Sequence, residues 1–323
     1  MLAIDLLVLP GSGPVGVATT VDLAEALTRS RTDGSRSVDV RVVGGDGGAV
    51  ALRGGMSIPA IPLAETGSAR PWVVIPGIGV SGATEVERRL TDHEVRAAAK
   101  WVASGARGGS RIAASCTGTF LAAEAGVLSD RTVTTTWWLA GVFAARYPRC
   151  RVDADRMLVR DGPVLTAGAA LGHVDLLLAL IEEEFGSTTA HAVSSRIAVA
   201  PRISQTPFRR STVYRELDPD LVTVERYVLD HLDQPIRLAE LAAAARLSSR
   251  TLTRRVQGAT GLSPIQFVQR IRVETALDLL RDPHRSVTEV AHAVGLADAS
   301  TLHRLLRRTT GQPPGWFRNG AAG

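Results

Sequence analysis

Cys116 is the residue in the first two-thirds of this 323-residue chain whose position most favours chemistry. It follows Arg111–Ala114, a predicted buried strand, and Thr117-Gly118 then leads into an alanine-rich segment predicted to be helical. Such a sharp strand-to-helix turn presents its central side chain at the edge of a sheet. The N–H groups that begin a helix favour a thiolate, and they also bind carboxylate or carbonyl oxygens. The sequence therefore predicts a reactive or ligand-binding cysteine.

A second kind of chemistry, the recognition of nucleic acid, is indicated by two segments in the last third of the chain. Each is a predicted helix with an N-cap residue, Ser248 or Asp298, an apolar face and a polar face. Arginine pairs with guanine edges or with phosphates. The side chains on the polar face are Arg250, Thr253, Arg254 and Gln257 in the first segment and Ser300, His303, Arg304 and Arg307 in the second.

These two segments belong to an internal repeat. Thr251-Leu-Thr-Arg254 recurs fifty positions later as Thr301-Leu-His-Arg304, and four further identities keep the same offset. A short helix is predicted before each segment, and Gly295 stands where the second tight turn needs a positive φ. Helix, turn and polar second helix form a helix-turn-helix unit. The sequence thus predicts two such units joined by a stiff helix over residues 264–280, able to enter successive major grooves.

The elements before residue 186 alternate between short β-branched runs and amphipathic stretches. This alternation predicts a mostly parallel sheet covered by helices on both faces, with ligands at the carboxyl ends of its strands. The predicted strands are Ile4–Leu9, Val38–Val43, Trp72–Ile75, Arg111–Ala114, Val133–Thr135, Met157–Arg160 and Val164–Thr166. The predicted helices are Thr20–Arg29, Asp92–Ser104, Thr119–Ala125 and Gly172–Phe185.

Composition and charge agree with two domains. The apolar fraction of 45% and the charged fraction of 21% are those of a globular chain, and no apolar run is long enough to span a membrane. Residues 1–221 carry equal numbers of basic and acidic side chains, so the whole net charge of +5 lies in residues 222–323. A basic module joined to a neutral body favours nucleic acid as the partner. Two cysteines offer no disulfide framework and fit the cytoplasm.

The segment from Leu238 to Phe317 resembles the DNA-binding domain of the AraC/XylS transcription regulators. The ending Gly311-Gln-Pro-Pro-Gly-Trp-Phe-Arg318 matches the signature of that family. Leucines at 296 and 306 replace two phenylalanines that are usual there, and these apolar exchanges do not threaten the fold. The resemblance implies that bases in a promoter are read by six side chains: Arg250, Thr253, Arg254, Ser300, His303 and Arg304.

Residues 3–190 resemble the PfpI-like branch of the class I glutamine amidotransferase superfamily. The resemblance rests on the run from Arg111 to Trp137 and on Thr166-Ala-Gly-Ala-Ala-Leu-Gly-His-Val-Asp175, and it implies a flavodoxin-like α/β sandwich. The whole chain is similar to GlxA-type regulators of the AraC/XylS family. The residues expected to line a ligand pocket are Gly77, Cys116, Thr117, Thr136, Trp137 and Gly168.

Catalysis by Cys116 requires a base within hydrogen-bonding distance. Relatives of this branch carry histidine where this chain has Thr136, and threonine is no base near neutral pH. His173 is the one substitute, although a place on a helix surface suits it better, and Asp22 falls where relatives place an acid beside the thiol. We therefore expect no catalytic residue. A ligand-sensing pocket is favoured over a cysteine that is merely packed in the core.

These observations predict an α/β plus all-α chain with three parts. Residues 1–190 form a sensor and dimerisation domain, 191–220 an irregular linker rich in proline and arginine, and 221–320 the tandem helix-turn-helix domain. The expected function is transcription regulation at the nucleoid by a homodimer that binds double-stranded promoter DNA and a small-molecule effector, with RNA polymerase as a further partner. No metal, cofactor or membrane is expected. The alternative is a cysteine-dependent amidase or deglycase with a fused DNA-binding module.

Overall fold

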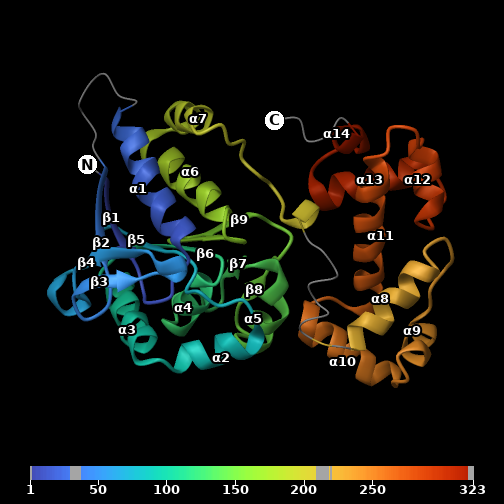
Figure 1. Cartoon of the computed structure of the whole chain (residues 1–323), viewed down its shortest axis with the longest axis horizontal. Coiled ribbons are helices and arrows are strands. Elements are labelled where there is room, and N and C mark those ends of the chain that lie inside the picture. Colours follow the sequence, from blue (N-terminus) through green and yellow to red (C-terminus); the bar gives the residue numbers. More distant parts are fainter. Residues whose placement is uncertain (1, 30–37, 209–217, 219, 319–323) are drawn as a thin grey trace. The chain divides into compact units, whose positions relative to one another are not determined.

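The computed structural model describes residues 2–29, 38–208, 218 and 220–318 of the chain. The chain divides into two compact units. One comprises Met1–Trp137 and Arg146–Arg202, and the other comprises Trp138–Ala145 and Ile203–Gly323. We describe each unit by itself (Figure 1).

The first unit is built on a six-stranded sheet with the order β2-β1-β5-β6-β10-β9. All neighbouring strands run parallel except β9, which is antiparallel to β10. The strands are β1 (Leu2–Leu7), β2 (Val38–Val43), β5 (Trp72–Ile75), β6 (Arg111–Ser115), β9 (Leu158–Asp161) and β10 (Val164–Ala167). Strands β5 and β10 are buried along their whole length, as expected for a parallel sheet covered on both faces.

Helices cover both faces of this sheet. One layer holds α1 (Pro14–Arg29), α6 (Gly172–Phe185) and α7 (Ser187–Arg196), which contact one another. The other layer holds α2 (Ala83–Thr91), α3 (His93–Arg107) and α4 (Gly118–Glu124) (Figure 1). Helix α6 contacts β6 and β10, and its Leu177 and Ile181 belong to the same buried core as residues of β1 and β5. The architecture confirms the α/β prediction.

Smaller elements complete the first unit. Their bounds are β3 (Gly48–Ala51), β4 (Ser57–Ala60), β7 (Thr132–Val133), β8 (Arg151–Val152) and the 3-10 turns Arg53–Gly55 and Leu63–Glu65. Nearly all of α5 (Ala140–Arg146) and of the 3-10 turn Trp137–Leu139 belongs to the second unit instead. The predicted strand Val133–Thr135 shrinks to β7, which pairs with β8 outside the main sheet. The β3–β4 hairpin was not predicted, because only Val50 of β3 is buried and the apolar signal is weak.

The predicted linker proves partly regular. Residues 187–196 form α7, and the first unit continues to Arg202 rather than ending at residue 190. The prolines that indicated an irregular segment all lie beyond α7, so they leave this helix intact. A 3-10 turn follows at Thr206–Phe208. The arginines at 209, 210 and 215 and Pro219 lie outside the described residues.

The second unit contains seven helices in its described C-terminal part. They are α8 (Asp220–Asp230), α9 (Leu238–Ala244), α10 (Ser249–Thr260), α11 (Pro264–Leu280), α12 (Val287–Ala293), α13 (Ala299–Thr310) and α14 (Pro314–Arg318) (Figure 1). Helix α11 contacts α8, α10, α12 and α14, as the predicted connecting helix should. Within the described residues, no helix is long and apolar enough to span a bilayer.

Candidate functional site

The two copies of the sequence repeat have the same local structure. Residues 250–267 correspond to residues 300–317. Each pair of corresponding residues is alike in being buried, half-buried or exposed, except the pairs 255/305 and 263/313. Leu252 and Val256 are fully buried, and so are their counterparts Leu302 and Leu306. The repeat is therefore a duplicated structural unit, as predicted.

Each second helix begins and ends in the same way. The N-cap side chains of Ser248 and Asp298 accept hydrogen bonds from the third residue of α10 (3.1 Å) and of α13 (2.7 Å). Both helices end at a glycine with a left-handed backbone. In the turn before α13, Gly295 has a φ of +71°, and a Cβ there would lie 2.3 Å from the carbonyl oxygen of Leu232. Glycine is required at this turn, as predicted.

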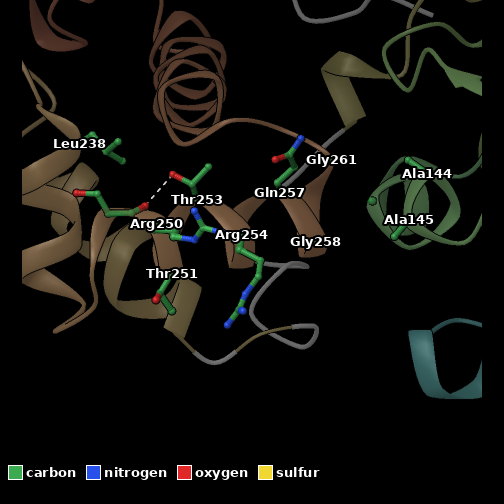
Figure 2. A pocket seen from close by; sticks show the side chains of 12 residues that line it. Ala144, Ala145, Leu238, Arg250, Thr251, Thr253, Arg254, Gln257, Gly258 and Gly261 are labelled. Carbon is green, nitrogen blue, oxygen red and sulfur yellow. Dashed lines mark hydrogen bonds between the residues drawn. The ribbon is translucent and has the colours of Figure 1, made fainter. Parts of the chain in front are cut away.

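The structure places the six predicted base-reading side chains on the outward faces of α10 and α13. Arg250 and Arg254 are exposed, and Thr253 is half-buried and donates from its hydroxyl to the carbonyl of Ser249 at 2.8 Å (Figure 2). Ser300, His303 and Arg304 repeat this pattern of exposure on α13. Two arginine-bearing helices with matched faces can each enter a major groove.

Cys116 occupies the predicted turn between β6 and α4. Its φ of +53° lies in the left-handed region, which is strained for a residue with a Cβ. Its N–H donates to the carbonyl of Ala167 (2.9 Å), and its carbonyl accepts from the hydroxyls of Thr119 (2.7 Å) and Thr135 (3.2 Å). A Cβ on Gly118 would lie 2.3 Å from the Pro76 carbonyl oxygen. The elbow is thus held by bonds on both sides and by close backbone packing.

The thiol of Cys116 differs from the prediction. It is only 8% exposed, and burial raises its pKa, so the neutral thiol is favoured. Thr117, the nearby Thr136 hydroxyl and the charge of Arg53 lower this pKa but do not cancel the effect of burial. Burial thus opposes the thiolate that the start of α4 favours, because removing a charge from water is costly.

Four of the six predicted pocket residues meet at the elbow. A Cβ on Gly77 would lie 3.7 Å from Cys116 Sγ and 3.3 Å from Thr117 Oγ1, and that hydroxyl accepts from the N–H of Ile78 (3.1 Å). Thr136 lies near the thiol, and among the described residues its fully buried hydroxyl has no hydrogen-bond partner. Trp137 is buried directly after it. Gly168 donates its N–H to Met157, next to the carbonyl that Cys116 contacts.

His173 is fully buried rather than on a helix surface. Its Nδ1 lies 2.7 Å from the Ser115 hydroxyl and its Nε2 lies 2.8 Å from the Thr20 hydroxyl. Because Thr20 donates to the Gly16 carbonyl (2.8 Å), it accepts from Nε2–H, and Nδ1 accepts from Ser115. Burial lowers the pKa of His173 to about 4. Both nitrogens are therefore engaged, and His173 is not a base for Cys116.

We expect His173 to make the stability of the first unit depend on pH. Its folded pKa of about 4 lies below the usual 6.5, so the unfolded state takes up the proton first. The contribution of His173 to the free energy of unfolding is complete above pH 6.5. It decreases by about 3 kcal/mol as the pH falls towards 4. Urea unfolding at pH 7.5 and 4.5 should show a smaller difference for His173→Gln than for the unchanged chain.

The exposed His191 of α7 provides the matched control. His191→Gln should keep the pH dependence of the unchanged chain, since it leaves His173 and its two hydroxyl partners in place. An identical loss of stability on acidification in all three proteins would contradict the assigned protonation of His173.

Two further side chains correct and extend the prediction. Asp22 is exposed, because it lies on the opposite face of α1 from the inward-facing Thr20 and thus not beside the thiol. Asp175, in the first turn of α6, is 5% exposed and forms an ion pair with Arg202 (2.6 Å) while also accepting from the Arg202 N–H (2.8 Å). The sequence motif that contains Asp175 does not indicate this ion pair, because Arg202 lies 27 residues further along the chain.

Comparisons with known proteins agree with this geometry. Residues 15–183 match the DJ-1/PfpI family, and residues 241–320 match a helix-turn-helix domain family. The chain is 28% identical over 304 residues to the HTH-type transcriptional regulator CdhR of Pseudomonas aeruginosa, covering 93% of this chain and 87% of CdhR. It is 28% identical over 215 residues to GlxA of Rhizobium meliloti, another HTH-type transcriptional regulator, covering 65% of each.

A solved structure confirms the fold of the first unit. A THiJ/PfpI family protein from Pseudomonas syringae, 20% identical, aligns with a TM-score of 0.50 over 62% of this chain and 76% of its own. An α/β unit of this fold joined to a duplicated helix-turn-helix unit defines a DNA-binding transcription regulator. The chain belongs to the DJ-1/PfpI family, and its last third is a helix-turn-helix domain of the AraC type.

Proposed function

We propose that the first unit senses a small molecule at the Cys116 elbow without catalysing a reaction. The observation that carries this proposal is a buried thiol beside which the described part of the chain places no base. Thr136 stands beside the thiol, and His173 is occupied by Ser115 and Thr20. Nucleophilic catalysis needs the base that this arrangement does not provide.

The buried hydroxyl of Thr136 supports ligand binding at the same place. A buried polar group without a partner costs free energy, and a ligand oxygen or nitrogen would remove that cost. Gly77 lets the backbone lie close to the elbow, since a Cβ there would lie 3.3 Å from Thr117 Oγ1 and 3.7 Å from the sulfur. Hydroxyl groups and a thiol thus gather at one place and favour a small polar metabolite.

A continuous series of contacts leads from the elbow to the end of the first unit. Ser115 precedes the cysteine and bonds to His173, which begins α6. Asp175, in the same helical turn, binds Arg202, the last residue of the unit. A ligand that moves the elbow would thus alter the place where the chain leaves the sensor, and differential binding of this kind shifts a conformational equilibrium.

The remaining partners follow from the regulator class. We propose a homodimer in the cytoplasm, bound to promoter DNA at the nucleoid and acting through RNA polymerase. Two tandem units in each subunit would then read a long operator. Light scattering of the purified chain, alone and with an operator fragment, measures the number of subunits.

The effector proposal predicts that Cys116→Ala and Thr136→Val abolish the response to effector but preserve operator affinity. Removal of one hydrogen-bonding group from a buried site costs about 1–3 kcal/mol, or roughly 5- to 150-fold in effector affinity. The operator is first located by mapping the protein across its own genome. Binding to that fragment is then measured by fluorescence anisotropy, with and without each member of a metabolite set.

The other outcomes would support one of the two alternative functions of the first unit. Turnover of an amide or glycated substrate that disappears in Cys116→Ala would establish the enzyme alternative. A set of metabolites that leaves operator affinity unchanged, with none retained in native mass spectrometry, would establish a first unit that only dimerises. Asp175→Asn tests the route: effector should still bind by calorimetry, while its effect on operator affinity becomes smaller.

A further inference from the structure

Trp316 breaks the pattern of the internal repeat. At the corresponding position of the first copy, the side chain of Gln266 accepts the Ser263 N–H (2.8 Å), and the Ser263 hydroxyl accepts the Gln266 N–H (3.3 Å). This reciprocal capping box closes the start of α11. In the second copy Pro313 replaces Ser263 and has neither an N–H nor a hydroxyl. Position 316 is therefore released from capping, and an indole occupies it.

The indole is held in place but not covered. Trp316 is 44% exposed, and its ring packs edge-to-face on Phe317 with centroids 4.9 Å apart. Phe317 belongs to the core that α11, α12 and α13 share. Among the described residues, no acceptor bonds to the indole N–H. A positioned aromatic ring thus presents a free donor to solvent.

The residues around the Trp316 ring favour DNA as the molecule that it contacts. Trp316 lines an open hollow of about 650 Å³ together with Ser300, His303 and Arg304, the three predicted base-reading residues of α13. Arg304 is steadied there by a hydrogen bond to Thr301 Oγ1 (3.1 Å). Arg304 gives the hollow a positive charge, and three of the lining residues belong to the face of α13 assigned to DNA reading. A ring at its rim would meet the groove wall, which is made of deoxyribose and phosphate.

We propose that Trp316 is a DNA contact, with its ring against a deoxyribose and its N–H donating to a phosphate oxygen. The contact adds affinity and fixes the register of α13, and it is independent of base sequence. Because the side chain is uncharged, it displaces no counterion. An arginine that contacts a phosphate does displace a counterion, so the salt dependence of binding distinguishes the two kinds of contact. The proposal rests on the assignment of α13 as a DNA-reading helix.

The test compares Trp316→Phe and Trp316→Ala in the full chain. The probes are the genomic fragment most strongly occupied by the protein and a shuffled duplex of equal length. Loss of one neutral hydrogen bond predicts about 2- to 10-fold weaker binding for Trp316→Phe. Loss of the ring as well predicts about 10- to 30-fold for Trp316→Ala. Both duplexes should be affected by similar factors, and the slope of log K against log salt should stay unchanged.

Two control variants make the outcome decisive. Leu229→Ala removes an exposed apolar side chain of α8 outside the hollow and should bind normally. Arg304→Ala should weaken binding and reduce the salt slope if it neutralises a phosphate, or weaken mainly the genomic fragment if it reads a base. If both Trp316 variants bind DNA normally while Arg304→Ala binds weakly, the Trp316 proposal is overturned and the assignment of α13 stands. If the Trp316 variants bind DNA normally but lower transcription, the partner of Trp316 is a protein and not DNA. Normal binding by Arg304→Ala too would overturn the α13 assignment.

Discussion

Alanine in place of Arg254 or Arg304 should weaken specific operator binding by about 1–3 kcal/mol each. Both arginines are exposed, and each is the sixth residue of a twelve-residue helix, so they occupy equivalent positions on the two outward faces. Helix α11, which joins the two units, is 17 residues or about 25 Å long. At that separation the two losses should add, so the double variant should lose about 2–6 kcal/mol.

The measurement is anisotropy with the mapped operator and with a shuffled duplex, at several salt concentrations. Arg281→Ala is the charge-matched control, because this exposed arginine pairs with Asp278 at the end of α11 and lies on neither outward face. A residue that reads a base should lower operator affinity much more than affinity for the shuffled duplex. Equal weakening on both would make that residue a phosphate contact. Unchanged binding by the double variant would contradict the assignment of both helices.

The DNA-binding module could be predicted closely because its signals are local. Cap residues, the 3.6-residue period and the spacing of the repeat lie within short stretches, and the predicted connecting helix over 264–280 matches the bounds of α11. Gly295 was predicted from a turn whose backbone only glycine fits. Arg246 takes a positive φ (+55°) in the first copy instead, which no rule for arginine indicates.

The elbow was located from sequence, but its electrostatics were not. The position of Cys116 follows from a strand, two small residues and a helix, all adjacent in the chain. The protonation of its thiol depends on burial, which arises from elements distant in sequence. The His173 network joins residues 20, 115 and 173 for the same reason, and a single sequence carries no record of such contacts.

The removal of Asp5 should destabilise the first unit by about 3 kcal/mol or more, as loss of one partner from a buried ion pair does. Asp5 lies in the middle of β1 and is 0% exposed. Its carboxylate accepts two hydrogen bonds from Arg41 (2.6 and 2.9 Å) and one from the Arg70 N–H (2.9 Å). Arg41 also donates to the Thr66 carbonyl (2.9 Å), so the group ties two strands to a loop.

Both Asp5→Ala and Asp5→Asn leave Arg41 facing a core without its countercharge, and the asparagine variant does so without leaving a cavity. Asp39→Ala is the matched control: its carboxylate pairs with Arg70 at 2.8 Å but is 47% exposed. Such a pair contributes about 0–1 kcal/mol. Urea unfolding followed by tryptophan fluorescence reports mainly on the first unit, since three of the five tryptophans, Trp72, Trp101 and Trp137, belong to it. If Asp5→Asn cost no more than Asp39→Ala, the carboxylate would not hold the sheet as its geometry indicates.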